Sequence, residues 1–373
     1  MKELYTTRRH DLFTVLPVTA VFLTACTAAL MLPAAAAAGM RSGIDSALNV
    51  LLPSLFPFMF LSAFASEYGM SDMVGRVLAP FTQAILFLPG EAGVTVLLSL
   101  VGGYPVGAVG IAALLRKNKI TPAQAKRMLC FCVNPGPAFL ISAVGEEMYK
   151  NRTLGVLLLI SQTCASLIIG IFLGLIARFR EKTVSSSKTA IHRRGAADAF
   201  IVSTHAACSG AVTLCALVVL FSAFSSLMFT SLRIDGRSDI GMLLRCIFEV
   251  TDGCTVLSQI GISPALTALT VGFGGICVHL QIFAALPGLD FSKVRFCISR
   301  MVCGLISAVI VTIGEMFITA PAAVYSNIEK TTAAFTAVTK TGSAALLTSS
   351  VLFLIFMHCG VNNERGGAYN ILQ

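Results

Sequence analysis

Two pairs of adjacent glycines lie deep inside apolar stretches of the sequence. The first pair, Gly102–Gly103, precedes Tyr104 and Pro105, and the second pair is Gly274–Gly275. Proline lacks a backbone donor, and each glycine costs about 1 kcal/mol relative to alanine in a helix. We therefore expect a broken helix at each pair, whose free amides and positive half-helix end could bind an anionic solute. The alternative is that the glycines only allow close helix packing.

Polar side chains accompany these interruptions. His279 and Gln281 follow the second glycine pair, and Asn134 stands beside Gly136 in a stretch with two prolines. The amide of Asn134 can donate and accept, so it suits a solute as well as an unsatisfied carbonyl of a neighbouring helix. We predict a substrate-binding site lined by Gly102, Gly103, Tyr104, Pro105, Asn134, Gly136, Gly274, Gly275, His279 and Gln281.

Two carboxylates occur in the apolar stretch 248–257, where charges are costly. Glu249 and Asp252 stand three residues apart, with Thr251 between them, so a helix would place both acids on one face. Such a pair could bind a coupling cation or exchange a proton. We assign Glu249, Thr251 and Asp252 to coupling or gating. The open alternative is that the segment ends early and both acids face water.

Sequence signatures of enzymes and metal sites are missing. The chain has no HExxH, Walker A or GxSxG motif, and its 12 cysteines are scattered without a CxxC pair. Cysteines of this kind suit packing between membrane helices. We therefore expect no enzymatic activity, no cofactor, no metal site and no disulfide framework.

The elements that must position these residues are membrane helices. The chain is 56% hydrophobic and 12% charged, with a mean hydropathy of +0.84, whereas soluble domains carry about 25% charged residues. Apolar runs recur along the whole chain, which predicts an all-α, polytopic transmembrane bundle. The predicted segments are about 12–33, 46–66, 73–88, 92–115, 128–146, 153–177, 205–230, 240–260, 263–286, 296–319 and 341–359, some of them re-entrant.

Basic residues indicate the orientation. Lys2, Arg8 and Arg9 precede the first apolar run, and basic clusters fill 116–127 and the linker 178–197. The positive-inside rule places these segments in the cytoplasm and accounts for the net charge of +9 without nucleic-acid binding. We expect the first helix to be retained, although it resembles a signal peptide and carries a lipoprotein-like cysteine at Cys26.

The two halves of the chain share a weak internal repeat. LSAF at 61–64 resembles FSAF at 221–224, and each copy precedes one of the double glycines. In our count, 46–66 and 205–230 cross in opposite directions, as do 92–115 and 263–286. This is the plan of an inverted repeat. The predicted regions are an N-terminal transmembrane helix (1–40), a first gate-like repeat (41–177), a basic linker (178–197), a second gate-like repeat (198–320) and a C-terminal loop, helix and tail (321–373).

These motifs resemble the sporulation integral membrane protein family of the YlbJ type, which contains gate domains like those of nucleoside and ferrous-iron transporters. The resemblance rests on LNVLLPSLFPFMFLSAF at 48–64, GGYPVGA at 102–108, CVNPGPAF at 132–139, FEVTDG at 248–253 and GGICVHLQ at 274–281. It implies a transporter-like protein of endospore-forming bacteria that moves dipicolinate, a small aromatic dianion, across the outer forespore membrane.

Our leading hypothesis is a transporter or facilitator for a small organic anion. The alternatives are a gate-domain nucleoside or cation carrier and a non-transporting structural or assembly protein of sporulation. The expected partners are a small-molecule solute and the lipid bilayer. Coupling to protons or cations and oligomerisation stay open.

Overall fold

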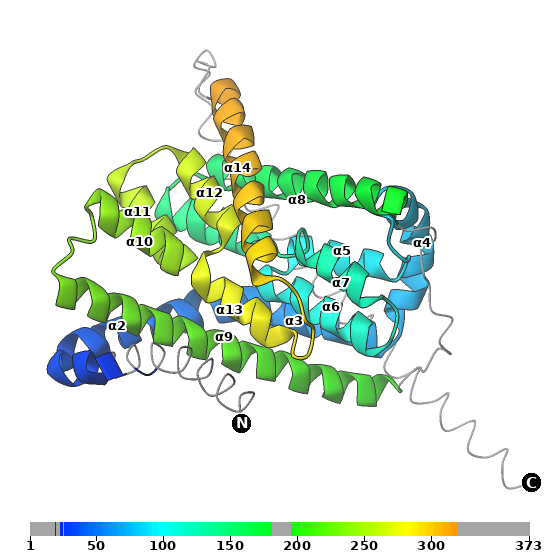
Figure 1. Ribbon diagram of the computed structural model, residues 1–373, viewed down its shortest axis with the longest axis horizontal. Coiled ribbons are helices and arrows are strands. Elements are labelled where there is room, and N and C mark those ends of the chain that lie inside the picture. The colour runs from blue at the N-terminus through cyan, green and yellow to red at the C-terminus, as the bar shows by residue number, and fades with distance from the viewer. Residues whose placement is uncertain (1–18, 20–22, 25, 181–194, 319–373) are drawn as a thin grey trace, which may run out of the picture.

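The computed structural model describes residues 19, 23, 24, 26–180 and 195–318. This part of the chain is helical and contains no strand, which confirms an all-α protein (Figure 1). The expectations for Lys2, Arg8, Arg9, the middle of the linker and the segment 341–359 lie outside the described residues.

The first half, up to the linker, is a series of helices of very unequal length. Its elements are α2 (Pro33–Asp45), the π-helix η1 (Ser46–Leu51), α3 (Leu52–Glu67), α4 (Met70–Ala84), α5 (Ala92–Val101), α6 (Tyr104–Arg116), α7 (Pro122–Leu129), the π-helix η2 (Ala138–Met148) and α8 (Arg152–Arg180). The second half contains α9 (Ala196–Leu232), α10 (Asp239–Phe248), α11 (Val250–Ile260), α12 (Pro264–Phe273), α13 (Gly275–Ala285) and α14 (Lys293–Ile318).

Four helical segments of the described chain are long and apolar enough to cross a membrane. They are Arg152–Phe179, Ala196–Leu232, Pro264–Ala285 and Lys293–Phe317. The pair Pro33–Leu51 and Leu55–Glu67, bent by 56°, adds a fifth if it forms one span. The protein is therefore a multi-pass membrane protein, and several predicted spans are not single helices.

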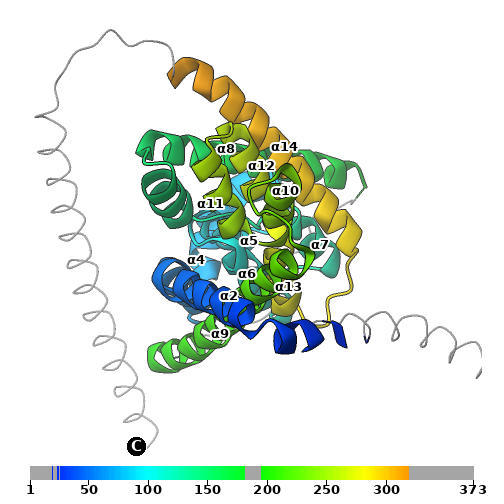
Figure 2. The same cartoon turned by 90° about the vertical axis from the view of Figure 1, so that its left-hand side faces the viewer.

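The long helices α8, α9 and α14 enclose the short helices (Figure 1). α9 lies along α2 and α3, and α8 crosses α14 on the other side of the short helices (Figures 1 and 2). Ser161 of α8 and Ser307 of α14 share a hydrogen bond of 2.8 Å, and Leu157 packs beside Gly314. On α9, Val219 meets Gly43 of α2 and the earlier Gly210 meets the later Met59 of α3, so α9 runs antiparallel to both. The predicted opposite directions of 46–66 and 205–230 are thus confirmed.

The short helices between these long helices are arranged in two different ways. α5 packs back along α6, and α10 packs back along α11, so each pair is a hairpin. α5 has 10 residues, or about 15 Å of helix, which is half the hydrocarbon thickness. In contrast, α12 runs on into α13 as one interrupted span of 22 residues. The segments 92–115 and 240–260 are therefore not single transmembrane helices.

The core lies where both halves meet. One buried cluster joins residues of the first half, such as Met128 and Leu158, to residues of the second half, such as Ala268 and Cys303. Small residues bring the backbones close: a methyl group added at Gly272 of α12 would lie 2.3 Å from the Cα of Gly304 in α14.

One part of the predicted topology is wrong. Exposed Arg116, at the end of α6, and exposed Pro287, just after α13, line the same pocket, and α6 packs on α13. The segments 92–115 and 263–286 therefore end at the same face, whereas the sequence count placed their ends on opposite faces. The error arose because the hairpin α10–α11 was counted as a crossing.

This topology predicts the sidedness of single cysteines. In a background without reactive native cysteines, Arg116→Cys and Asp290→Cys should react with a membrane-impermeant maleimide from the same side of sealed vesicles. Arg237→Cys, an exposed position in the loop between α9 and α10, should react from the other side because α9 spans the bilayer between them. Labelling of positions 116 and 290 from opposite sides would support the topology predicted from the sequence instead.

Candidate solute site at the broken helices

The two interruptions of the first half lie against each other. Gly103, with a φ of +89°, ends the hairpin tip between α5 and α6, a conformation that residues with a Cβ rarely adopt. A methyl group added at Gly136 would lie 3.1 Å from the Gly103 nitrogen and 3.0 Å from the Val101 carbonyl oxygen. The break between α7 and η2 thus touches the tip of the hairpin α5–α6.

The second half repeats this arrangement. Gly274 and Gly275, with φ of +87° and +74°, separate α12 from α13. A methyl group added at Gly275 would lie 3.2 Å from the Phe248 carbonyl oxygen and 3.3 Å from the Val250 nitrogen. Extended Glu249 stands between those two residues and separates α10 from α11. The break in α12–α13 therefore touches the tip of the hairpin α10–α11.

Tyr104 connects the two halves at these breaks. Its hydroxyl donates a hydrogen bond of 2.7 Å to the carbonyl oxygen of Val271, in the last turn of α12. A methyl group at Gly274 would lie 3.5 Å from its ring. The structure therefore brings together residues that are about 170 positions apart in the chain, as the sequence predicted. By shape, however, the hairpin around Gly103 matches the hairpin around Glu249 rather than the break at Gly274. The inverted repeat itself stays a prediction.

Asn134 is used inside the protein. Its side chain is 2% exposed, its amide nitrogen donates to the Phe131 carbonyl oxygen at 2.8 Å, and Ser166 of α8 donates to its amide oxygen. These bonds hold the loop between α7 and η2 against α8. These hydrogen bonds favour a structural role for Asn134 over the alternative of solute binding.

His279 is also held by protein groups. Its Nε2 lies 3.0 Å from the Phe273 carbonyl oxygen, which can only accept, so Nε2 carries the proton. Its Nδ1 lies 3.7 Å from the sulfur of Cys297, and the rings of Phe273 and Phe296 pack edge-on around it. His279 thus ties the start of α13 to α14 and lies outside the pocket.

Pro105 and Gln281 line a pocket of about 720 Å³ between α3, α6, α9 and α13. The pocket extends from buried Met59 to exposed Arg116, and most of its lining is apolar. Its polar lining residues are Ser62, Glu67, Arg116, Lys117, His205, Ser209, Thr213 and Gln281. This is a space large enough for a small organic molecule, next to the breaks.

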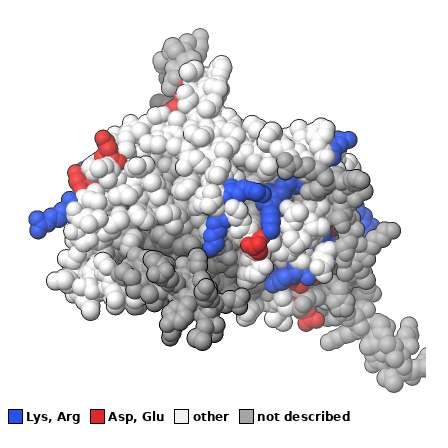
Figure 3. All heavy atoms as spheres, in the orientation of Figure 1, with Lys and Arg blue, Asp and Glu red and all other residues white. Residues whose placement is uncertain are grey.

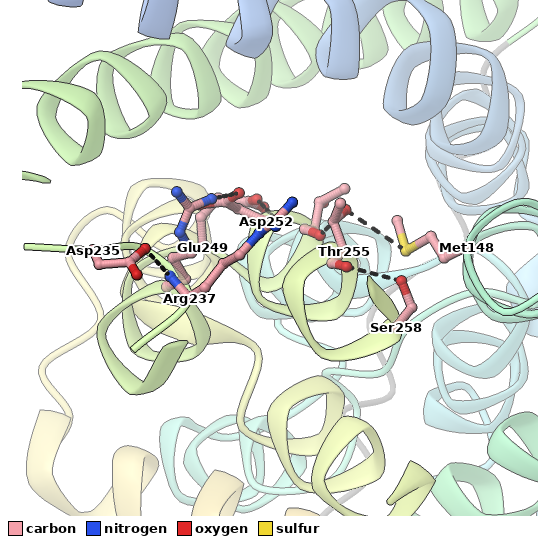
Figure 4. A network of polar contacts seen from close by, with 9 residues as sticks. Met148, Asp235, Arg237, Glu249, Asp252, Thr255 and Ser258 are labelled. Atoms are coloured by element: carbon pink, nitrogen blue, oxygen red, sulfur yellow. Dashed lines mark hydrogen bonds and ion pairs between the residues drawn. The ribbon is translucent and has the colours of Figure 1, made fainter. Parts of the chain in front are cut away.

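The predicted acidic pair has two separate partners. Glu249 accepts a hydrogen bond of 2.7 Å from the backbone nitrogen of Asp252 and so caps α11, with Thr251 buried in its first turn. Asp252 forms an ion pair of 2.7 Å with Arg245, whose guanidinium lies over the ring of Phe229. Both acids belong to a polar network along α10 and α11 (Figure 4). Among the described residues, no cluster of three or more His, Cys, Asp or Glu side chains could hold a metal ion.

A buried polar layer between α8, α12 and α14 was not predicted from the sequence. Gln162 donates a hydrogen bond of 2.7 Å to the Ala268 carbonyl oxygen, and Arg300 donates one of 2.5 Å to the Gly272 carbonyl oxygen. Arg300 is a charged residue inside the predicted span 296–319, and a charge at membrane depth is the sequence signal that could have indicated this polar layer.

This chain is similar to a known family and to a known protein. Residues 48–233 match the family described as "Gate: Nucleoside recognition", a range that includes both breaks of the first half. The chain contains a Gate domain. It is also 27% identical over 328 residues to the sporulation integral membrane protein YlbJ of Bacillus subtilis (strain 168), which covers 78% of this chain and 80% of the relative.

The Gate-domain match and this relative confirm the resemblance to the YlbJ-type sporulation family. Neither description names an enzymatic activity. No solved structure matches the chain.

The close approach of the hairpin α5–α6 to the loop between α7 and η2 can be tested at Gly107. A methyl group there would lie 1.7 Å from the carbonyl oxygen of Cys132, so the two backbones would have to separate. We expect Gly107→Ala to destabilise the protein by about 3 kcal/mol, the upper end for overpacking. Thermal unfolding of the detergent-solubilised protein measures this change.

The matched control is Gly210→Ala, because a methyl group at Gly210 meets only the flexible end of Met59. Its midpoint should stay near that of the unmodified protein. Equal midpoints for both variants would contradict the close packing of α6 on the loop after α7.

Proposed function

We propose that this protein is a transporter or facilitator for a small organic anion, and that this anion is dipicolinate, carried across the outer forespore membrane. The observation that supports the proposal is the meeting of four helix interruptions at Tyr104. Irregular backbone at membrane depth is tolerated only where it is buried in protein or lines a cavity, and secondary transporters bind their substrates at such breaks.

The arrangement favours an anionic solute. α6 begins at Tyr104 and α13 at Gly275, so two half-helices direct their positive ends toward the breaks. Most of the pocket that leads there is apolar, but its described lining has more basic than acidic side chains. Glu67 is its one described acid and pairs with Lys117 at 3.5 Å, and Arg116 is a further cation in the lining.

The pocket gives the proposal a direction of access. Its exposed lining residue Arg116 lies on the face that the positive-inside rule assigns to the cytoplasm, and the pocket extends to Pro105 beside the break at Gly103. Lys and Arg side chains gather on one part of the visible surface, whereas much of the remainder carries no charge (Figure 3). Solute that enters from the cytoplasmic face would pass the bond between Tyr104 and Val271 to leave on the other side.

The description of the Gate family favours a second candidate, a carrier of nucleosides. The name of the YlbJ relative places that protein in sporulation and assigns it no solute. A structural or assembly protein, in which the breaks are only packing devices, is the third reading.

A flux measurement separates the three candidates. Proteoliposomes that contain the purified protein should take up labelled dipicolinate, and an imposed proton gradient should show whether uptake is coupled to protons. Uptake of labelled uridine that unlabelled dipicolinate does not reduce, together with no uptake of labelled dipicolinate, would favour the nucleoside carrier. The absence of flux for both solutes under every gradient would leave the structural reading.

The glycines at the breaks should be essential for uptake. Gly103→Leu would place a side chain against Leu55, and Gly275→Leu would drive one into the hairpin tip at Phe248. Both positions also require positive φ. We expect uptake to fall at least about tenfold in each variant, since transport requires the breaks to keep their geometry.

A fair control is Gly261→Asn. This position also has positive φ, but it faces open space at the end of α11, and asparagine tolerates that conformation. All variants should still insert into the membrane. Normal uptake by both leucine variants would remove the proposed site.

The bond between Tyr104 and Val271 should affect transport separately from stability. Tyr104→Phe removes this bond and should lower stability by about 0.5–1.5 kcal/mol while changing the rate of uptake. The control is Tyr149→Phe, which removes the contact between Tyr149 and Thr267 away from the pocket. It should lower stability without changing uptake per folded protein. Equal uptake by the two variants would assign Tyr104 to packing alone.

A further inference from the structure

Arg300 is the one arginine among the described residues that is completely buried. It lies in α14, seven residues after the helix begins, and its exposed fraction is 0%. α14 packs along α12 and α8, so the guanidinium lies inside the helix bundle rather than facing lipid.

The guanidinium has only part of its hydrogen-bonding capacity satisfied. Nη2 donates to the carbonyl oxygen of Gly272, whereas Nε and Nη1 have no partner among the described residues. None of the ion pairs found in the described part of the chain includes Arg300. A guanidinium stays protonated in proteins, so this group is a permanent buried cation with unused donors.

Such a group is unfavourable unless another charge joins it. Removal of an ion from water is strongly unfavourable, and one neutral carbonyl compensates this penalty only in part. The negative end of α12 offsets some of the penalty, because Gly272 lies in the last turn of that helix. The remaining unsatisfied donors call for an anionic partner in another state of the protein.

The position of Arg300 indicates where such an anionic partner could bind. Its bonded carbonyl is two residues before Gly274, and the neighbouring Val271 carbonyl accepts the bond from Tyr104. Gln281, beyond the same break, faces the pocket. Arg300 therefore contacts the last turn of α12, directly before the interruption, although it is not itself among the residues that line the pocket.

We propose that Arg300 is the fixed positive charge that binds a carboxylate of the solute when the α12–α13 break opens. This inference rests on the transport of an organic anion proposed above and names the residue that selects it. The unused Nε and Nη1 donors match carboxylate oxygens, which form strong charge-assisted hydrogen bonds with guanidinium. The same charge repels a metal cation and disfavours a coupling cation at this break.

The first test uses the unmodified protein and a charge series of ligands. Thermal stabilisation by pyridine-2,6-dicarboxylate should exceed that by pyridine-2-carboxylate, and the uncharged pyridine-2,6-dicarboxamide should give none. Equal stabilisation by the dicarboxylate and the dicarboxamide would overturn the role of a fixed charge.

The second test exchanges the arginine. Arg300→Gln keeps a donor for the Gly272 carbonyl but removes the charge, and it should weaken dicarboxylate binding at least about thirtyfold. Arg300→Lys keeps the charge and should retain part of the binding. Arg295→Gln removes an exposed arginine from the same helix and should bind like the unmodified protein.

The outcomes distinguish this inference from the proposed function. If the unmodified protein carries no dicarboxylate into proteoliposomes, the proposed function fails and the inference fails with it. If it does carry the dicarboxylate and Arg300→Gln binds it with unchanged affinity, only the inference fails. If Arg300→Gln does not assemble, the Arg300→Lys variant and the ligand charge series decide. The proposal is overturned if Arg300→Lys loses all dicarboxylate binding and the unmodified protein is stabilised equally by charged and uncharged ligands.

Discussion

The structure depends on one constraint: backbone amides and carbonyls inside a bilayer need partners within the protein. A continuous helix meets this requirement by itself, but this chain interrupts its helices at Gly103, at 130–137, at Glu249 and at Gly274. Each interruption lies against another one, and Tyr104 joins the two pairs through the Val271 carbonyl. The irregular backbone is thereby gathered at one place in the bundle, where solute binding becomes feasible.

Glycine makes these contacts feasible because two backbones can approach only where no Cβ stands between them. Gly136 and Gly275 each lie against the tip of a folded-back hairpin, and Gly107 lies against the carbonyl of Cys132. The two interpretations of the glycines, close helix packing and solute binding, are therefore linked. Close packing is what brings the interruptions to one place, and it leaves the starts of α6 and α13 directed toward them.

The charges in the apolar stretches of the second half fall into two groups. Glu249 and Asp252 are compensated, one by the backbone of α11 and the other by Arg245, so both stabilise the local hairpin. Arg300 is compensated only at Nη2. This incompletely paired cation beside a broken helix is the observation on which the proposed binding of an anion, rather than of a cation, depends.

The sequence by itself determined the class of the protein and the positions of its interruptions. Apolar runs specify membrane helices, and glycine and proline disrupt helices locally, so 102–105, 134–137 and 274–275 were found correctly. Tertiary structure decided how the pieces pair. Apolar composition is the same for a helix that crosses and for one that folds back, so the hairpin α10–α11 could not be recognised from its residues. Partners that lie far apart in the chain, such as Asn134 with Ser166 and Arg300 with Gly272, likewise exist only once the helices pack.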